Sequence, residues 1–64
     1  MDTQALEYLN TKIDERRKAL VESIGDGSAK DFSEYQQLCG QVRGLLAAQF
    51  EISDLLRKMK DQDE

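Results

Sequence analysis

Few side chains in this sequence could carry chemistry. The chain has one cysteine, Cys39, and no histidine. Two of its carboxylates, Asp14 and Asp54, are each followed four residues later by a lysine, Lys18 and Lys58. Residues four apart on a helix form ordinary surface ion pairs. A general acid or base needs a desolvated cleft with converging groups. No enzyme activity, small-molecule substrate or cofactor is therefore expected.

The single thiol also limits metal binding and cross-linking. One cysteine cannot form an intramolecular disulfide, and a chain without histidine cannot assemble a tetrahedral zinc site. Two roles for Cys39 remain open: joining two chains across a symmetric interface, or packing as a small hydrophobe on the apolar flank of a helix. We favour packing and expect no metal.

Composition restricts the partners of the chain. Its 64 residues, 39% of them hydrophobic, form at most one domain, residues 1–64, and domains this small usually need a metal, disulfides or self-association. Thirteen acidic and nine basic residues give a net charge of −4, so nucleic acid and anionic lipid are not expected partners. The start, MDTQALEYLN, does not resemble a signal peptide, and no apolar stretch approaches the roughly 20 residues that span a membrane. We expect a soluble intracellular protein that binds protein.

The second half of the chain carries a coiled-coil repeat. Steps of three and four residues separate its members, one of which is polar: Tyr35, Leu38, Val42, Leu45, Gln49, Ile52, Leu56 and Met59. In the first half, Leu6, Ile13 and Leu20 recur every seven residues, and Leu9 and Ile24 widen the stripe. The sequence therefore predicts two helices, at about 3–24 and 29–60.

A glycine-rich segment, Gly25 to Ser28, separates the two predicted helices. Gly25 suits the left-handed position after a helix, and Gly27 tolerates any turn geometry. Two capping boxes overlap after the turn, one beginning at Ser28 and one at Asp31, and we prefer Ser28 as the cap. The prediction is an all-α antiparallel helical hairpin, completed by association with other chains.

A turn centred near Gly27 would pair Leu20 with Tyr35, Ile13 with Val42 and Leu6 with Gln49. The second helix would then extend two to three turns past the first. Another chain is expected to cover the apolar side chains of this overhang, which are Leu55, Leu56 and Met59.

A second predicted surface lies on the outer side of the second helix. It comprises Gly40, Arg43, Gly44, Ala47 and Phe50. Each glycine inside a helix costs about 1 kcal/mol relative to alanine, and close packing of another helix would offset that cost. Plain exposure and a glycine-assisted bend are the alternatives. The expected interface combines this face with the overhang.

Polar residues interrupt both stripes. Gln49 could set the register between helices or be a solvated amide, which we favour. Arg16 and Arg17 could extend out of the seam into solvent, which we favour, or reach acidic groups of a partner. With Lys12 and Lys18 they form a basic cluster predicted to lie near Arg43, but interleaved acidic residues weaken it as a nucleic-acid site.

The stretch from Glu34 to Leu45, EYQQLCGQVRGL, and its continuation ISDLLRKM into an acidic end resemble small virion proteins of tailed bacteriophages. The likeness also includes ERRKAL at residues 15–20 and the glycine-rich turn. This resemblance implies a structural or assembly role at the head or portal of a phage particle, against larger virion proteins. It implies a location in the virion or host cytoplasm and brings no catalytic residues.

Two other functions stay open. The layout is similar to that of a plasmid copy-control hairpin, which dimerises into a four-helix bundle and binds RNA, but no motif aligns. The chain could thus be a homodimeric regulator or inhibitor of a protein. An RNA-binding bundle is the less favoured version.

Overall fold

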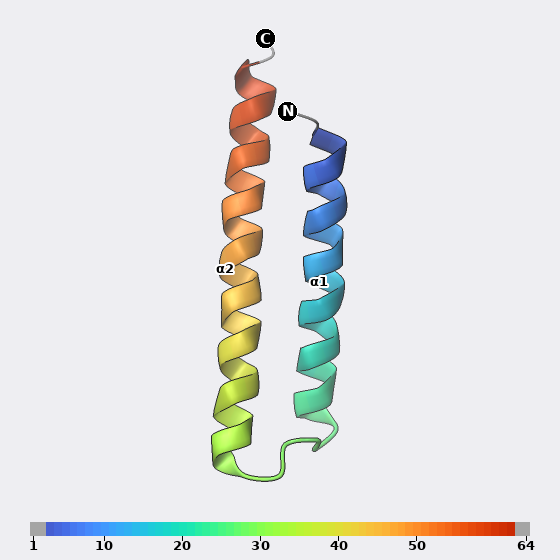
Figure 1. Cartoon of the computed structure of the whole chain (residues 1–64), viewed down its shortest axis with the longest axis vertical. Coiled ribbons are helices and arrows are strands. Elements are labelled where there is room, and N and C mark those ends of the chain that lie inside the picture. Colours follow the sequence, from blue (N-terminus) through green and yellow to red (C-terminus); the bar gives the residue numbers. More distant parts are fainter. Residues whose placement is uncertain (1–2, 63–64) are drawn as a thin grey trace.

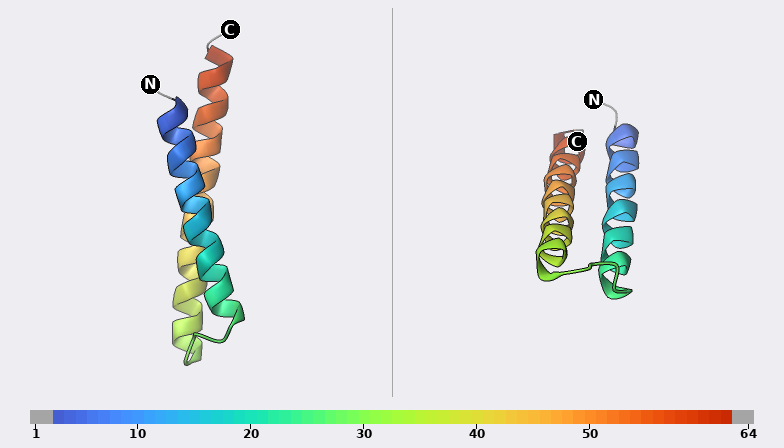
Figure 2. Two further views of the ribbon diagram at one scale, coloured as in Figure 1. Left: turned by 90° about the vertical axis from the view of Figure 1, so that its right-hand side faces the viewer. Right: turned by 60° about the horizontal axis from the view of Figure 1, so that its bottom comes forward.

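The two heptad stripes meet in an antiparallel hairpin. In the computed structural model, which describes residues 3–62, α1 spans Thr3–Gly25 and α2 spans Phe32–Gln62. The helices lie side by side in a rod of 51 × 15 × 14 Å (Figure 1). They cross at a shallow angle and remain adjacent along α1 (Figure 2). The predicted all-α helical hairpin is confirmed.

A Schellman motif ends α1. The N–H of Ser28 donates to the carbonyl of Ser23 over 3.1 Å, and the N–H of Gly27 donates to that of Ile24 over 3.3 Å. Gly27, at φ 84°, is the residue in the left-handed conformation. The prediction that Gly25 takes this left-handed position was wrong. Gly25 is the last residue of α1, and the left-handed glycine, Gly27, comes two residues later.

Asp31 caps α2. Its Oδ1 accepts the N–H of Glu34 over 2.8 Å, and Glu34 in turn accepts the N–H of Lys30 over 3.3 Å. The preference for Ser28 as the cap, and for a helix beginning at residue 29, was wrong. Ser28 cannot cap α2, because its N–H closes the end of α1 and its hydroxyl donates to Asp26 over 2.6 Å. The connection therefore occupies residues 26–31.

This longer connection changes the predicted register. Gln49 bonds to Asp14 and Arg17 of α1, which lie eight and eleven residues beyond the predicted neighbour, Leu6. Figure 1 shows why: α2 begins below the last turn of α1 and also ends above its first turn. The extra length of α2 is thus divided between both ends. The prediction of a single overhang at the C-terminal end was wrong.

The seam is thin for a protein core. Leu9 is 47% exposed, the other members from Leu6 to Ile24 in α1 and from Leu38 to Met59 in α2 are half-buried, and among residues 3–61 no side chain is fully buried. Each helix can be covered on one side only, because a hairpin has just two elements. The remaining faces of both helices stay in contact with solvent.

Candidate interaction surface

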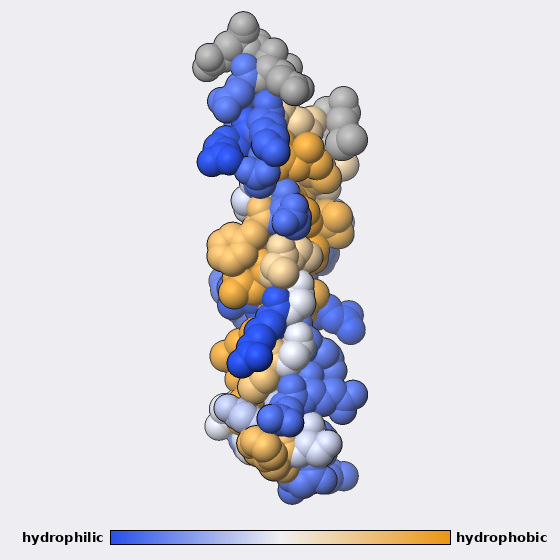
Figure 3. Space-filling model, turned by 90° about the vertical axis from the view of Figure 1, so that its left-hand side faces the viewer, coloured by the Kyte–Doolittle hydropathy of each residue, from blue (hydrophilic) through white to orange (hydrophobic). Residues whose placement is uncertain are grey.

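Large apolar side chains line α2 on a face that α1 does not cover. We call this face the outer stripe; it consists of Phe32, Tyr35, Cys39, Leu46 and Phe50. Steps of three, four, seven and four residues separate its members, so they share one side of the helix. Phe32 is 70% exposed, Phe50 67% and Tyr35 44%, while Cys39 is half-buried. Hydrophobic surface spreads over the middle of this side of the molecule (Figure 3).

A shallow groove indents the first half of the outer stripe. It has a volume of about 380 Å³, and its lining consists of Phe32, Tyr35, Gln36, Cys39, Gly40 and Arg43. The rings of Phe32 and Tyr35 are stacked, with centroids 6.2 Å apart. The neighbouring Cys39 side chain, one turn further along α2, raises the pKa of the Tyr35 phenol. The groove has an aromatic end and a basic end.

Glycine creates the open space in this groove. A Cβ atom built on Gly40 would meet nothing within 4 Å, and the same is true of Gly44. Neither glycine is therefore needed for packing within the hairpin. Gly40 lines the groove, whereas Gly44, one turn further on, does not.

The eight predicted interface residues do not form a single surface. Gly40 and Arg43 line the groove, and Phe50 follows them on the same side of α2. Gly44 and Ala47 are exposed beside them. Their role in binding remains a prediction.

The three predicted overhang residues divide between two environments. Leu56 and Met59 are half-buried members of the seam, and Leu55 is 39% exposed on the opposite flank from Phe50. Phe32 and Leu46 were not among the predicted interface residues, and Tyr35 was predicted to lie in the seam. The spacing of these residues from Cys39 and Phe50 was the signal that could have identified them.

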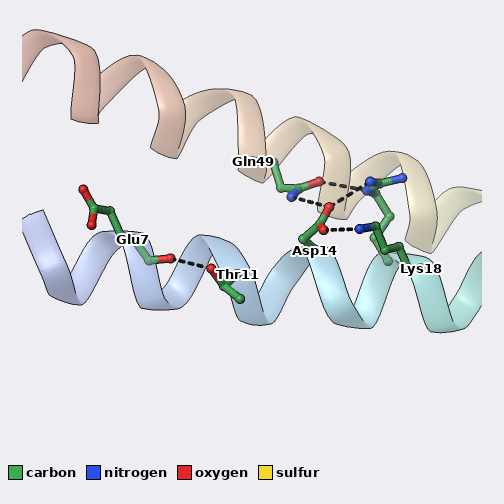
Figure 4. A network of polar contacts seen from close by, with 6 residues as sticks. Glu7, Thr11, Asp14, Lys18 and Gln49 are labelled. Carbon is green, nitrogen blue, oxygen red and sulfur yellow. Dashed lines mark hydrogen bonds and ion pairs between the residues drawn. The ribbon is translucent and has the colours of Figure 1, made fainter.

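A polar network crosses the middle of the seam. Gln49 accepts a hydrogen bond from Nε of Arg17 over 2.8 Å and donates one to Asp14 over 3.1 Å, and Asp14 also pairs with Arg17 and Lys18 (Figure 4). The solvated amide favoured for Gln49 was wrong. Arg17 turns into this network instead of extending into solvent.

The network holds Asp14 in its charged form. Hydrogen bonds from Lys18, Gln49 and Arg17, in that order of importance, place the pKa of Asp14 well below its ordinary value. On the outside of α2, Lys58 and then Arg57 lower the pKa of Asp54. Both carboxylates are ion-paired with basic residues three and four positions further along the same helix.

Another polar group in the seam is less well satisfied. Asn10 lies between Leu6 and Ile13 in the heptad stripe of α1, and its Oδ1 atom is buried with no hydrogen-bond partner among the described residues. An unpaired buried oxygen costs about 1–3 kcal/mol. The seam is therefore less stable than its apolar pattern suggests.

Most of the predicted basic cluster is paired within α1. Lys12 contacts Glu15 at 3.5 Å and lies 5.5 Å from the ring centre of Tyr8, while Arg17 and Lys18 bind Asp14. Backbone phosphates are bound by lysine and arginine side chains that are available to them. This pairing reduces the positive charge that nucleic acid would meet.

Comparisons with other proteins do not place the chain in a family. No family model matches it, and no curated protein or solved structure is significantly similar to it. Within residues 3–62, neither helix has the length and apolar character needed to cross a membrane. In the same part of the chain, no cluster of three or more histidine, cysteine or acidic residues is suitable for a metal ion.

Proposed function

We propose that this chain is a non-enzymatic structural or assembly component that binds other protein chains through the uncovered faces of α2. The observation that carries this proposal is that large apolar side chains lie on the surface of the hairpin and not in its interior. No described side chain is fully buried, yet Phe32, Tyr35, Leu46 and Phe50 are exposed on one side of one helix. Exposed apolar patches of this kind mark interaction sites in soluble proteins.

The proposed setting is the particle of a tailed bacteriophage, at the head or portal, with a larger virion protein or another copy of the chain as the partner. Its support is the resemblance of residues 34–59 to small virion proteins. The elongated hairpin agrees with such a role, because a two-helix rod can add its faces to the helices of a larger protein.

A homodimeric regulator or inhibitor is the second candidate. The long, thin seam and the exposed stripe favour it, because two such hairpins can complete a four-helix bundle. RNA binding is less favoured, since α1 pairs three of its four clustered basic residues internally.

Cross-linking mass spectrometry of purified particles from the source of the chain tests the proposal. We expect the chain in repeated copies, with amine cross-links from Lys58 and Lys60 of α2 to neighbouring protein. Absence of the chain from purified particles would refute a role in the virion. Its presence without any protein cross-link from α2 would refute binding through that helix.

A further inference from the structure

The chain exposes more surface than a compact protein of its size. Its accessible area is 5017 Å², whereas a compact monomer of 7.3 kDa is expected to expose about 4,200 Å². The excess is about 800 Å², the area that each partner contributes to a standard protein interface. One further interface of ordinary size would give this chain the exposure of a compact protein.

The outer stripe carries both a projection and a recess. Phe50 projects with 67% of its surface exposed, and the groove beside Cys39 and Gly40 lies on the same side of α2. Cys39 and Phe50 are eleven residues apart, which is close to three helical turns, or about 16 Å along the helix. A surface that holds a projection and a matching recess can pair with itself by a two-fold rotation.

We infer that the occupant of the outer stripe is a second copy of this chain, packed antiparallel through α2 with Phe50 of each copy in the groove of the other. The two-fold axis crosses the outer stripe halfway between Cys39 and Phe50, close to Leu46, whereas Gly44 lies at the same level but about 140° around the helix from Cys39. The inference rests on the proposed function and names the partner for that surface. The assembly is a four-helix bundle with the two α2 helices at its centre.

The side chains brought together by this rotation are chemically compatible. Phe50 of one copy enters a recess bounded by Tyr35 and the guanidinium of Arg43, which can stack on its ring. At the ends of the interface, Phe32 lies opposite Arg57 of the other copy, which gives a second contact between an aromatic ring and a cation. Each pairing occurs twice because the interface is symmetric.

The same rotation separates the two thiols. Cys39 of one copy lies about 16 Å along the interface from Cys39 of the other. This is beyond the Cα separation of about 7 Å that a disulfide can bridge. The wild-type dimer is therefore noncovalent and insensitive to reductant.

Solution mass with two matched variants tests the inference. We expect the purified chain to sediment with twice its mass of 7.3 kDa. Phe50→Glu should weaken association at least about a hundredfold, since two buried aromatic contacts are lost per dimer. The control is Tyr8→Glu, because Tyr8 is 65% exposed but lies on the outer side of α1, away from the proposed interface. It should leave the mass unchanged.

A distance between spin labels tests the orientation without altering Phe50. In a Cys39→Ser background, labels at Lys60→Cys should be about 47 Å apart in the antiparallel dimer and about 10 Å apart in a parallel one. This readout still decides the matter if Phe50→Glu does not fold. A short distance would overturn the arrangement.

The outcomes separate this inference from the proposed function. A folded wild-type chain that stays monomeric, or a dimer that Phe50→Glu leaves intact, overturns self-association through the outer stripe. If such a chain is cross-linked to another protein in the particle, the proposed function still stands. A dimer with the expected label distance supports the inference even where the chain is missing from particles.

Discussion

Replacing Gly40 with leucine should affect folding and association in opposite directions. Glycine in a helix costs about 0.8–1 kcal/mol relative to alanine, and leucine is nearly as favourable as alanine. A Cβ at this position meets nothing within 4 Å, so the hairpin has room for it. Gly40→Leu should raise the free energy of unfolding of the single hairpin by about 0.8 kcal/mol, or the melting temperature by roughly 3–6 °C.

The same side chain would fill the groove that receives Phe50. Association should weaken at least about tenfold, because a centrally placed aromatic contact is lost. Gly44→Leu is the matched control: it gains the same helix propensity but lies outside the groove.

Thermal unfolding followed by circular dichroism at low and high protein concentration, with sedimentation of the same samples, would separate the two effects. The melting temperature of Gly40→Leu should exceed that of the wild type in dilute samples and lose this advantage in concentrated ones. A variant that gains stability and still dimerises as tightly as the wild type would refute the role of the groove.

Three further predictions concern the seam. Leu45→Asp places a charge in the middle of the half-buried stripe, so circular dichroism should show loss of helix; unchanged helicity and mass would contradict the hairpin. Asn10→Leu should stabilise the chain by at least about 1 kcal/mol in urea unfolding, because it removes an unpaired buried oxygen; a destabilised variant would show that Asn10 is satisfied. The pKa of Asp14 is lower in the folded state than the unfolded value of about 3.9, so its contribution to stability is present above that pH and decreases as the pH falls further. Asp14→Asn should therefore flatten the acid side of the stability profile measured by urea unfolding, and an equally steep profile would contradict the network.

The fold could be predicted because its signal is repeated along the chain. Apolar residues at heptad spacing occur in both halves, and one glycine-rich break separates them. Each repeat supports the same helix and the same face, so a single polar residue such as Gln49 does not obscure the pattern. The bounds of the helices were accordingly close to those observed, except where the turn begins and ends.

The register depended on the few residues of the turn. Ser28 and Asp31 each begin a capping box, and the sequence favoured Ser28; Asp31 caps α2 because the N–H of Ser28 closes the Schellman motif at Gly27. The connection has six residues in place of the four predicted, and α2 begins below the last turn of α1; together these place Gln49 at the polar network with Asp14. Periodicity alone cannot predict the register between two helices, because it gives the buried face of each helix and not its axial position.

The axial position of α2 also decides which of its residues lie on the candidate interaction surface. Tyr35 fits the seam by spacing, but it lies near the start of α2, which begins below the end of α1, and it is exposed beside Phe32. The outer stripe has its own spacing of three, four and seven residues. It became recognisable once the seam and its partner helix were located.

Contacts between copies at the groove can be measured directly by nuclear magnetic resonance. A mixture of isotope-labelled and unlabelled chains allows only contacts between different copies to be observed, and the sequence contains just two phenylalanines. Covering of the outer stripe by a second copy predicts a nuclear Overhauser effect between the Phe50 ring protons of one copy and the Gly40 α-protons of the other. A dimer that shows contacts between copies elsewhere, and none between Phe50 and Gly40, would contradict covering of the outer stripe by a second copy.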